Sequence, residues 1–225
     1  MLVLATLVVT GSLLIYLGWT RFKRDPAQSA LGQREDALRS LGAFLSQEGS
    51  VKRCVVVGNP FLKLPQRDPV AQRFEAASLR GLKRGLGERV ILEECRYPSL
   101  TAEAMSDPAA VVMPPGVSTP LSFMVTRGAW DDLLKGLRED TVVISLIGIP
   151  SGLSEQRWWR DEHGPRLALV LPDYRVMGDP ETVASAFASG KIIAALEAPT
   201  PSNVKTGLDS SPEVLQLRTA RPSPH

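Results

Sequence analysis

Residues 141–147, Thr-Val-Val-Ile-Ser-Leu-Ile, form an apolar run that ends at Gly-Ile-Pro. The run is continuous rather than alternating, which is the pattern of a strand buried on both faces. Residues 51–57 repeat this pattern, with Cys-Val-Val-Val followed by Gly-Asn-Pro. Strands of this kind are typical of parallel sheets covered by helices on each side, so the two runs favour an α/β fold.

Four more short apolar runs are spaced along the chain, and most of them end at Pro, Gly or Asp. They are residues 90–95, 109–113, 166–171 and 191–196. Together the six runs predict a mostly parallel sheet of about five to six strands.

Helical patterns occupy several of the gaps between these runs. Asp68-Pro69 and Asp179-Pro180 each combine an N-cap residue with a first-turn proline, and each pair predicts the start of a helix. Residues 130–137 carry the apolar spacing of a third helix. Strands that alternate with helices over short connections predict helices on both faces of the sheet. This arrangement is similar to single lobes of periplasmic-binding-protein-like or flavodoxin-like domains, a resemblance of topology that implies no functional residue.

The first twenty residues have the composition of a membrane-spanning segment. Residues 1–20 contain no Asp, Glu, Lys, Arg or His, and a helix of this length spans about 30 Å, the thickness of the hydrocarbon core. Tyr16 and Trp19 lie near its end, and three basic residues follow within residues 21–24. The segment predicts a retained single-pass anchor. A cleaved signal peptide is the alternative, although no basic residue precedes the apolar stretch.

The chain after the anchor divides into three parts. Residues 21–49 predict a basic juxtamembrane stretch and an amphipathic helix, and residues 50–198 predict the α/β domain. Residues 199–225 hold five prolines and four serines, and they predict a disordered tail. The basic residues after the anchor place the domain in the cytoplasm by the positive-inside rule, with an extracytoplasmic location left open.

Composition narrows the classes of function. The 225 residues carry a net charge of +2, which argues against a nucleic-acid partner. The two histidines and two cysteines form no metal-binding spacing, and no phosphate-binding glycine motif follows a strand, so neither metal nor cofactor is expected. Cys54 and Cys95 are expected as small core residues in neighbouring strands, with a disulfide as the alternative.

Ligands of parallel α/β sheets bind beyond the carboxyl ends of the strands. The polar residues predicted at that edge, and therefore as a ligand site, are Asn59, Tyr97, Ser118, Thr119, Ser151 and Asp173. The connection of residues 114–128 also carries Ser122 and Arg127. These groups suit either an anion site or the ordinary capping of turns, and both interpretations stay open.

An enzyme is the alternative class, and the sequence assigns it no catalytic residue. Ser151 follows the apolar run of residues 141–147, but Gly-Ile-Pro-Ser-Gly differs from the nucleophile motif G-x-S-x-G. His163 is the only histidine other than the terminal residue, so it is the only candidate base of that type. A hydrolase that uses Ser151 or Asp173 is therefore the second hypothesis.

Trp158 and Trp159 are adjacent indoles between charged residues. Trp and Arg are frequent at the centres of protein interfaces, so this pair predicts an exposed contact surface for a protein partner. Packing of one or both rings against the domain is the alternative. The leading hypothesis is a membrane-anchored α/β domain that binds a small ligand or a protein partner without catalysis.

Overall fold

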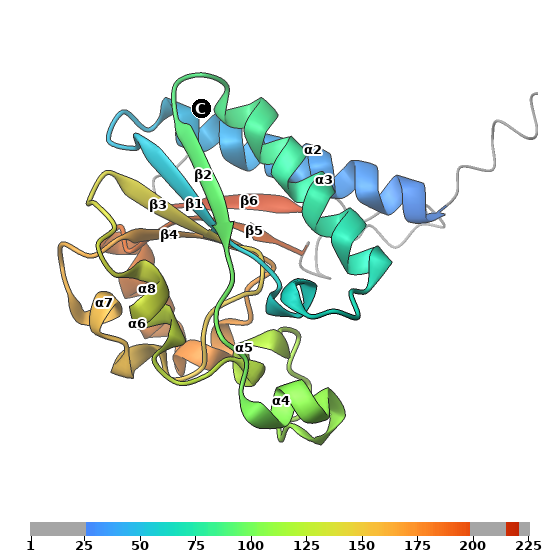
Figure 1. Ribbon diagram of the computed structural model, residues 1–225. Helices are drawn as coiled ribbons and strands as arrows, with labels where there is room; N and C mark the ends of the chain where they lie inside the picture. The colour runs from blue at the N-terminus through green and yellow to red at the C-terminus, as the bar shows by residue number, and fades with distance from the viewer. Residues whose placement is uncertain (1–25, 199–214, 221–225) are drawn as a thin grey trace, which may run out of the picture.

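The computed structural model describes residues 26–198 and 215–220. Six strands form one sheet in the order β2-β1-β3-β4-β5-β6 (Figure 1). The strands are β1 (Arg53–Val57), β2 (Ile91–Arg96), β3 (Thr141–Ser145), β4 (Arg166–Val170), β5 (Ile192–Glu197) and β6 (Gln216–Thr219). Strands β1 to β5 are parallel to their neighbours, whereas β6 runs antiparallel to β5. The predicted α/β class and mostly parallel sheet are confirmed.

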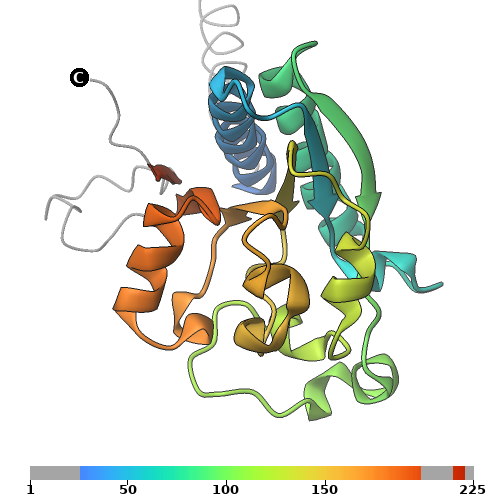
Figure 2. The ribbon, with the colours of Figure 1, turned by 90° about the vertical axis from the view of Figure 1, so that its left-hand side faces the viewer.

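Helices cover both faces of this sheet, as predicted. The helices are α2 (Pro26–Gln47), α3 (Pro69–Leu86), α4 (Ala102–Ser106), α5 (Leu121–Met124), α6 (Ala129–Leu134), α7 (Arg157–Arg160) and α8 (Pro180–Ala188). Helices α2 and α3 lie side by side on one face, and α6, α7 and α8 lie in a row on the other (Figures 1 and 2). Four short 3-10 helices complete the connections: η1 (Pro60–Lys63), η2 (Pro108–Ala110), η3 (Leu153–Glu155) and η4 (Tyr174–Met177).

The two predicted helix starts are confirmed in detail. The Asp68 carboxylate accepts hydrogen bonds from the backbone N–H groups of Val70 and Ala71, at 2.9 and 3.3 Å. The helix α3 begins at Pro69, directly after this cap. The Asp179 carboxylate accepts from the backbone N–H of Thr182 at 2.7 Å at the start of α8. In both helices the residue after the cap is a proline. Proline has no backbone N–H, and at this first position an N–H would have no partner within the helix.

The face covered by α2 and α3 is packed through glycines. A Cβ atom added at Gly81 would lie 2.2 Å from the carbonyl oxygen of Glu35, and one added at Gly85 would lie 2.1 Å from that of Arg39. The two helix backbones are therefore in contact. Leu38, Leu41 and Leu45 of α2 are fully buried against the sheet.

The opposite face is packed with large aromatic side chains. Trp130 of α6 stacks on Trp158 of α7, with 5.9 Å between the ring centroids, and Trp158 meets the edge of Trp159 at 5.7 Å. Phe187 of α8 belongs to the same core, together with Leu167 of β4. On this face, therefore, aromatic side chains occupy the space between the helices and the sheet, whereas on the other face the helix backbones are in direct contact.

Two expectations about strands are wrong. Residues 109–113 form no strand: η2 ends at Ala110, and Val112 is 88% exposed within the connection from β2 to β3. Prolines on both sides of this run prevent regular strand pairing. The second error lies in the predicted disordered tail, because Gln216–Thr219 form β6 on the edge of the sheet.

The other predicted segments at the two ends fall outside the described residues. They are the anchor of residues 1–20 and the remainder of the tail, residues 199–214 and 221–225. Within residues 26–198 and 215–220, none of the helices combines the length and the hydropathy needed to cross a bilayer.

The two cysteines occupy neighbouring strands, as expected. Cys54 lies on β1 and Cys95 on β2, and both thiols are free. Burial raises the pKa of the Cys54 thiol to about 12 and that of Cys95 to about 11. Neither thiol is therefore a reactive thiolate at neutral pH.

Candidate ligand-binding site

The strand order places one crevice at the carboxyl edge of the sheet. In the doubly wound order 2-1-3-4-5, neighbouring strands β1 and β3 send their connections to opposite faces, and ligands bind where those connections diverge. Here the chain leaves β1 toward α3 on one face and leaves β3 toward α7 on the other (Figure 1). The long connection from β2 to β3, which carries α4, α5 and α6, passes the same point.

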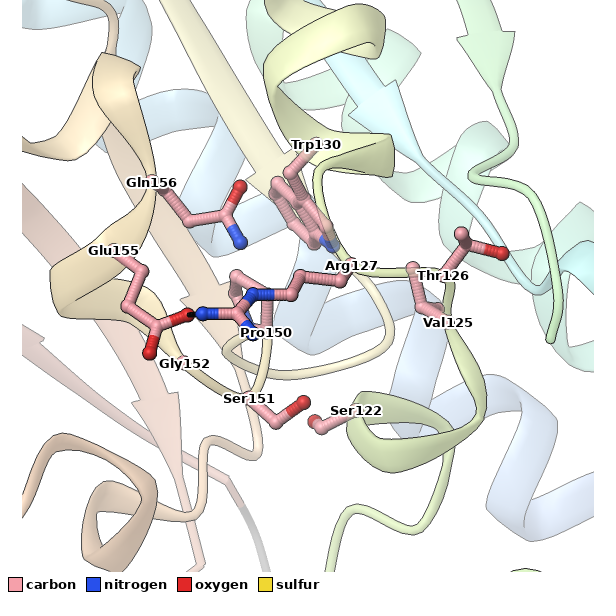
Figure 3. Close-up of a pocket in the computed structure, with 10 residues that line it drawn as sticks. All are labelled: Ser122, Val125, Thr126, Arg127, Trp130, Pro150, Ser151, Gly152, Glu155 and Gln156. Carbon is pink, nitrogen blue, oxygen red and sulfur yellow. Dashed lines mark hydrogen bonds and ion pairs between the residues drawn. The ribbon is translucent and has the colours of Figure 1, made fainter.

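A pocket of about 220 Å³ lies between that connection and the loop after β3 (Figure 3). One wall is the stretch from α5 to α6, and the other is the loop that leads through η3 to α7. The lining residues are Ser122, Val125, Thr126, Arg127, Trp130, Pro150, Ser151, Gly152, Glu155 and Gln156. The volume is below the ~300–1,000 Å³ of typical drug-sized sites, so the pocket suits a small molecule.

Two buried polar atoms of this lining have no hydrogen-bond partner. They are Nε1 of Trp130 and Oε1 of Gln156, and the two residues are 1% and 4% exposed. Figure 3 shows the Gln156 amide facing the indole ring of Trp130. Buried polar atoms in folded proteins are nearly always paired, because an unpaired one costs about 1–3 kcal/mol. Both atoms belong to residues that line the pocket, and Figure 3 draws the amide nitrogen of Gln156, rather than Oε1, toward the other lining residues.

Two serines join the walls of the pocket. The backbone N–H of Ser151 donates to the carbonyl oxygen of Ser122 at 3.3 Å. The Ser122 hydroxyl lies 3.2 Å from Oγ1 of Thr119, to which it can donate. In Figure 3 the hydroxyls of Ser151 and Ser122 point toward one another. Ser151 is half-buried, so its hydroxyl is accessible from the pocket.

Arg127 and Glu155 form an ion pair at the mouth of the pocket, so their opposite charges neutralise each other there. The Arg127 guanidinium contacts the Glu155 carboxylate, and their side chains are 81% and 52% exposed. The anion-binding interpretation of Arg127 gains no support from this geometry, because a carboxylate of the protein already neutralises the guanidinium.

Asp173 lies at the carboxyl edge, as predicted, but its carboxylate is engaged by the protein. It is 5% exposed, accepts from the backbone N–H of Ser118 at 3.1 Å, and accepts from Nε of Arg175 at 2.8 Å. These bonds, above all those from Arg175, hold the pKa of Asp173 well below its usual range. Arg175 also donates to the carbonyl oxygen of Gly116. Asp173 and Arg175 thus fix the connection of residues 114–120 beside η4.

Asn59 and Tyr97 belong to a second cluster, beyond the ends of β1 and β2. The Asn59 side chain accepts from the backbone N–H of Phe61 at 3.0 Å and caps η1. The Glu75 carboxylate accepts from the Asn59 backbone N–H at 3.0 Å and from the Tyr97 hydroxyl at 2.7 Å. Burial and the hydrogen bond to Glu75 raise the pKa of Tyr97. None of these residues lines the pocket.

Of the six predicted ligand residues, only Ser151 lines the pocket. Thr119 lies directly behind it, because its hydroxyl meets Ser122 and its methyl group packs against Gly148. A Cβ at Gly148 would lie 2.8 Å from that methyl group, and Gly148 has a φ of +83°, so both space and conformation require glycine there. The Ser118 side chain is exposed, and the residue contributes its backbone N–H to Asp173.

The expectation of two exposed indoles is wrong for Trp158. This residue is 6% exposed and belongs to the core, whereas Trp159 is half-buried. Since the Trp158 ring is enclosed by Trp130 and Trp159, it is not available to a protein partner in this structure.

The structure does not pair Ser151 with His163. Ser151 follows the carboxyl end of β3, whereas His163 precedes the amino end of β4, and the two strands are parallel. The residues therefore lie at opposite edges of the sheet, about 16 Å apart along a five-residue strand. The His163 side chain lies instead 3.6 Å from Glu139. Among the residues that the structure describes, no group of three or more His, Cys, Asp or Glu side chains is placed to hold a metal.

Gln156 and Trp130 are the pocket residues that sequence reasoning missed as ligand contacts. Gln156 belongs to no recognisable sequence motif, and Trp130 occupies an ordinary apolar position in a helical pattern. Neither residue therefore has a sequence feature that predicts a ligand contact. No protein-family model, curated protein or solved structure matches this chain. The function is therefore inferred from the pocket itself.

Proposed function

We propose that this chain is a membrane-tethered α/β domain that binds a small polar ligand, without catalysis, in the pocket beyond β3. The observation that carries the proposal is the pocket itself, which lies at the carboxyl edge of the sheet where the connections of β1 and β3 diverge. The wall of the pocket carries polar side chains, among them Ser122, Ser151 and Gln156, that can fix the orientation of a small ligand.

The surroundings of the pocket support binding more than reaction. A serine nucleophile needs a base within about 3 Å, and the only histidine in the described residues lies at the other edge of the sheet. The two charged groups at the mouth, Arg127 and Glu155, pair with each other. Asp173, the other candidate for chemistry, has its carboxylate oxygens engaged by Ser118 and Arg175.

The binding proposal can be tested by NMR on the ¹⁵N-labelled full chain in lipid nanodiscs. A library of small polar molecules is added, and the indole N–H resonance of Trp130 is followed. We expect at least one chemical class to shift this resonance in the parent and to lose that effect in Gln156→Leu. Gln72→Leu is the matched control, because Gln72 is exposed on α3, outside the pocket.

A shift that survives Gln156→Leu unchanged would contradict the proposed pocket. So would a library in which every member that binds leaves the resonance of Trp130 in place.

The tether is proposed from residues 1–20, whose apolar composition and flanking basic residues favour a retained anchor. We expect the full chain to stay with membranes after alkaline carbonate extraction. In sealed, right-side-out vesicles we expect the domain to resist protease until detergent is added. Digestion without detergent would reverse the orientation, and release by carbonate would contradict the anchor.

A further inference from the structure

We propose that the exposed side of α3 binds anionic lipid headgroups of the membrane to which the chain is tethered. This inference rests on the proposed tether, and it assigns a partner to a surface that lies outside the ligand pocket. It follows from the charges of α3, from their contrast with the opposite face of the sheet, and from the short connection between α2 and the apolar residues 1–20.

The exposed side of α3 is basic along its length. The buried side of the helix holds Ala77, Ser78, Gly81, Leu82 and Leu86. Four basic residues are exposed on the other side: Arg73, Arg80, Lys83 and Arg84. Residues that are three, four or seven positions apart share one face of a helix, so these four side chains form a single basic stripe.

Acidic side chains offset only part of this stripe. Glu75 is the one acidic residue of α3, and its half-buried carboxylate accepts hydrogen bonds from residues beyond β1 and β2. Glu35 of α2 pairs with Arg80 and Arg84, whose side chains nevertheless stay 55% and 64% exposed. The basic groups of the stripe are therefore accessible to a partner.

The two faces of the sheet differ in charge. Helices α2 and α3 together contain six basic and three acidic residues, whereas α6, α7 and α8 together contain two basic and three acidic residues. A domain with this distribution turns α3 toward a negatively charged surface and its other face away from it.

The proposed tether keeps α3 close to a bilayer. Helix α2 begins at Pro26, so only residues 21–25 separate it from the apolar residues 1–20, and five residues reach at most about 18 Å. Gly81 and Gly85 of α3 meet the α2 backbone at residues 35 and 39, so the two helices run in the same direction (Figure 1). Binding of α3 to the same bilayer is then an intramolecular event, favoured by a high effective concentration of headgroups.

Anionic lipids supply the charge that matches the stripe. A bilayer that contains them attracts Lys and Arg side chains held within about one Debye length, roughly 10 Å at 0.1 M salt. The exposed residues among the four basic ones are Gln72 and Ala76. The stripe thus has no aromatic ring to stack on a nucleic-acid base, and a lipid surface is the better match.

The binding is tested with the ¹⁵N-labelled full chain in nanodiscs that contain a gadolinium-chelating lipid. One set is otherwise phosphatidylcholine alone, and the other is an equimolar mixture of phosphatidylcholine and phosphatidylglycerol. In the mixture at low salt, we expect the amide signals of α3 to be broadened at least about threefold more than those of α8. We expect this ratio to fall by more than half in phosphatidylcholine alone, and also in the mixture at about 1 M salt.

Paired charge reversals separate the stripe from the net charge. Arg73→Glu with Lys83→Glu changes the two residues of the stripe that form no ion pair within residues 26–198 and 215–220. Lys135→Glu with Arg160→Glu is the matched control on the opposite face, where both residues are exposed. We expect the first variant to lose the lipid preference of the α3 signals and the second to keep it. Thermal unfolding checks that both variants fold.

The possible failures are distinguishable. Equal broadening of α3 and α8 in the anionic nanodiscs would overturn the proposed surface, and equal broadening of α3 in the two lipid compositions would overturn the anionic class. Release of the chain by alkaline carbonate would mean that the tether fails. Flotation with vesicles of the same two compositions then decides this inference: recovery with the anionic vesicles alone supports the surface, and recovery with both or with neither overturns it.

Discussion

The two faces of the sheet are packed by different means. On the face of α2 and α3, glycines bring two helix backbones into contact, and the buried Ser78 hydroxyl is paired on both sides, with Phe74 and Arg34. On the face of α6, α7 and α8, tryptophans fill the core, and three buried atoms lack hydrogen-bond partners: Nε1 of Trp130, Nε1 of Trp158 and Oε1 of Gln156.

The two faces therefore differ in how they are packed and in where the pocket lies. The glycine-packed face has its buried Ser78 hydroxyl satisfied and no room for a methyl group at Gly81 or Gly85. The tryptophan face retains a pocket and unmet hydrogen-bonding capacity. Of the four buried side-chain atoms without partners in the described residues, two, those of Trp130 and Gln156, belong to side chains that line this pocket.

The largest effect is expected at the centre of the tryptophan face. Trp158→Ala removes a ring that is 6% exposed, and we expect the free energy of unfolding to fall by about 4 kcal/mol. Trp159→Ala removes a half-buried ring and should cost about 1 kcal/mol. Urea denaturation of both variants measures the difference. Equal costs would mean that the two indoles are equally exposed and that the partner-surface hypothesis deserves renewed attention.

The glycine face is tested by a single added methyl group. Gly85→Ala places a Cβ 2.1 Å from the Arg39 carbonyl oxygen, and we expect a loss of about 3 kcal/mol because a helix backbone must move. Gly32→Ala is the control on α2, where nothing lies within 4 Å, and it should stabilise the protein by up to about 1 kcal/mol. Thermal unfolding distinguishes the two. A tolerated Gly85→Ala would show that α2 and α3 are not in backbone contact.

The contribution of Asp173 to stability can be tested at the carboxyl edge of the sheet. Asp173→Asn removes the charge that Arg175 and Ser118 hold, and we expect a loss of about 2 kcal/mol at pH 7. The pKa of Asp173 is lower in the folded state than in the unfolded chain, where it is about 3.9. Its contribution is therefore complete above about pH 5 and declines as the pH falls through and below 4.

The gap in stability between the parent and Asp173→Asn should accordingly narrow in acid. Urea titrations at pH 7, 5, 4 and 3 measure it. A gap that stays constant over this range would show that the charge of Asp173 contributes nothing to the fold.

The smallest effects compare buried polar groups on the two faces. Ser78→Ala breaks two satisfied hydrogen bonds and should cost about 1.5 kcal/mol. Gln156→Met replaces an unpaired acceptor with an apolar atom of similar size, so we expect a change of no more than about 0.5 kcal/mol in either direction. The same variant should lose ligand binding. A destabilisation by Gln156→Met as large as that by Ser78→Ala would mean that Gln156 is a structural residue.

Much of the fold was predictable because its signals are local. Asp68 and Asp179 cap helices through hydrogen bonds to residues two or three positions away, so a short stretch of sequence contains the whole interaction. The five parallel strands were visible as apolar runs because both faces of the sheet are covered. The wrong prediction of a strand at residues 109–113 also relied on an apolar run, and an apolar run alone does not distinguish a strand from a connection.

The strand β6 and the pocket depend on contacts between distant residues. Gln216–Thr219 are mostly exposed, and only their pairing with β5 defines them as a strand. In the pocket, Ser151 was accessible to prediction because it follows a buried strand. Gln156 and Trp130 come from different elements and meet only in the folded chain, where both line the pocket.

The short strand β6 also protects the molecule from its neighbours. It pairs with the outer edge of β5, whose first five residues, from Ile192 to Leu196, are buried and uncharged. A chain that stopped after residue 198 would leave that apolar edge open, as a template for strands of other molecules. The strand β6 thus acts as a guard against self-association, and we expect a chain truncated after residue 198 to be more prone to aggregate than the full chain.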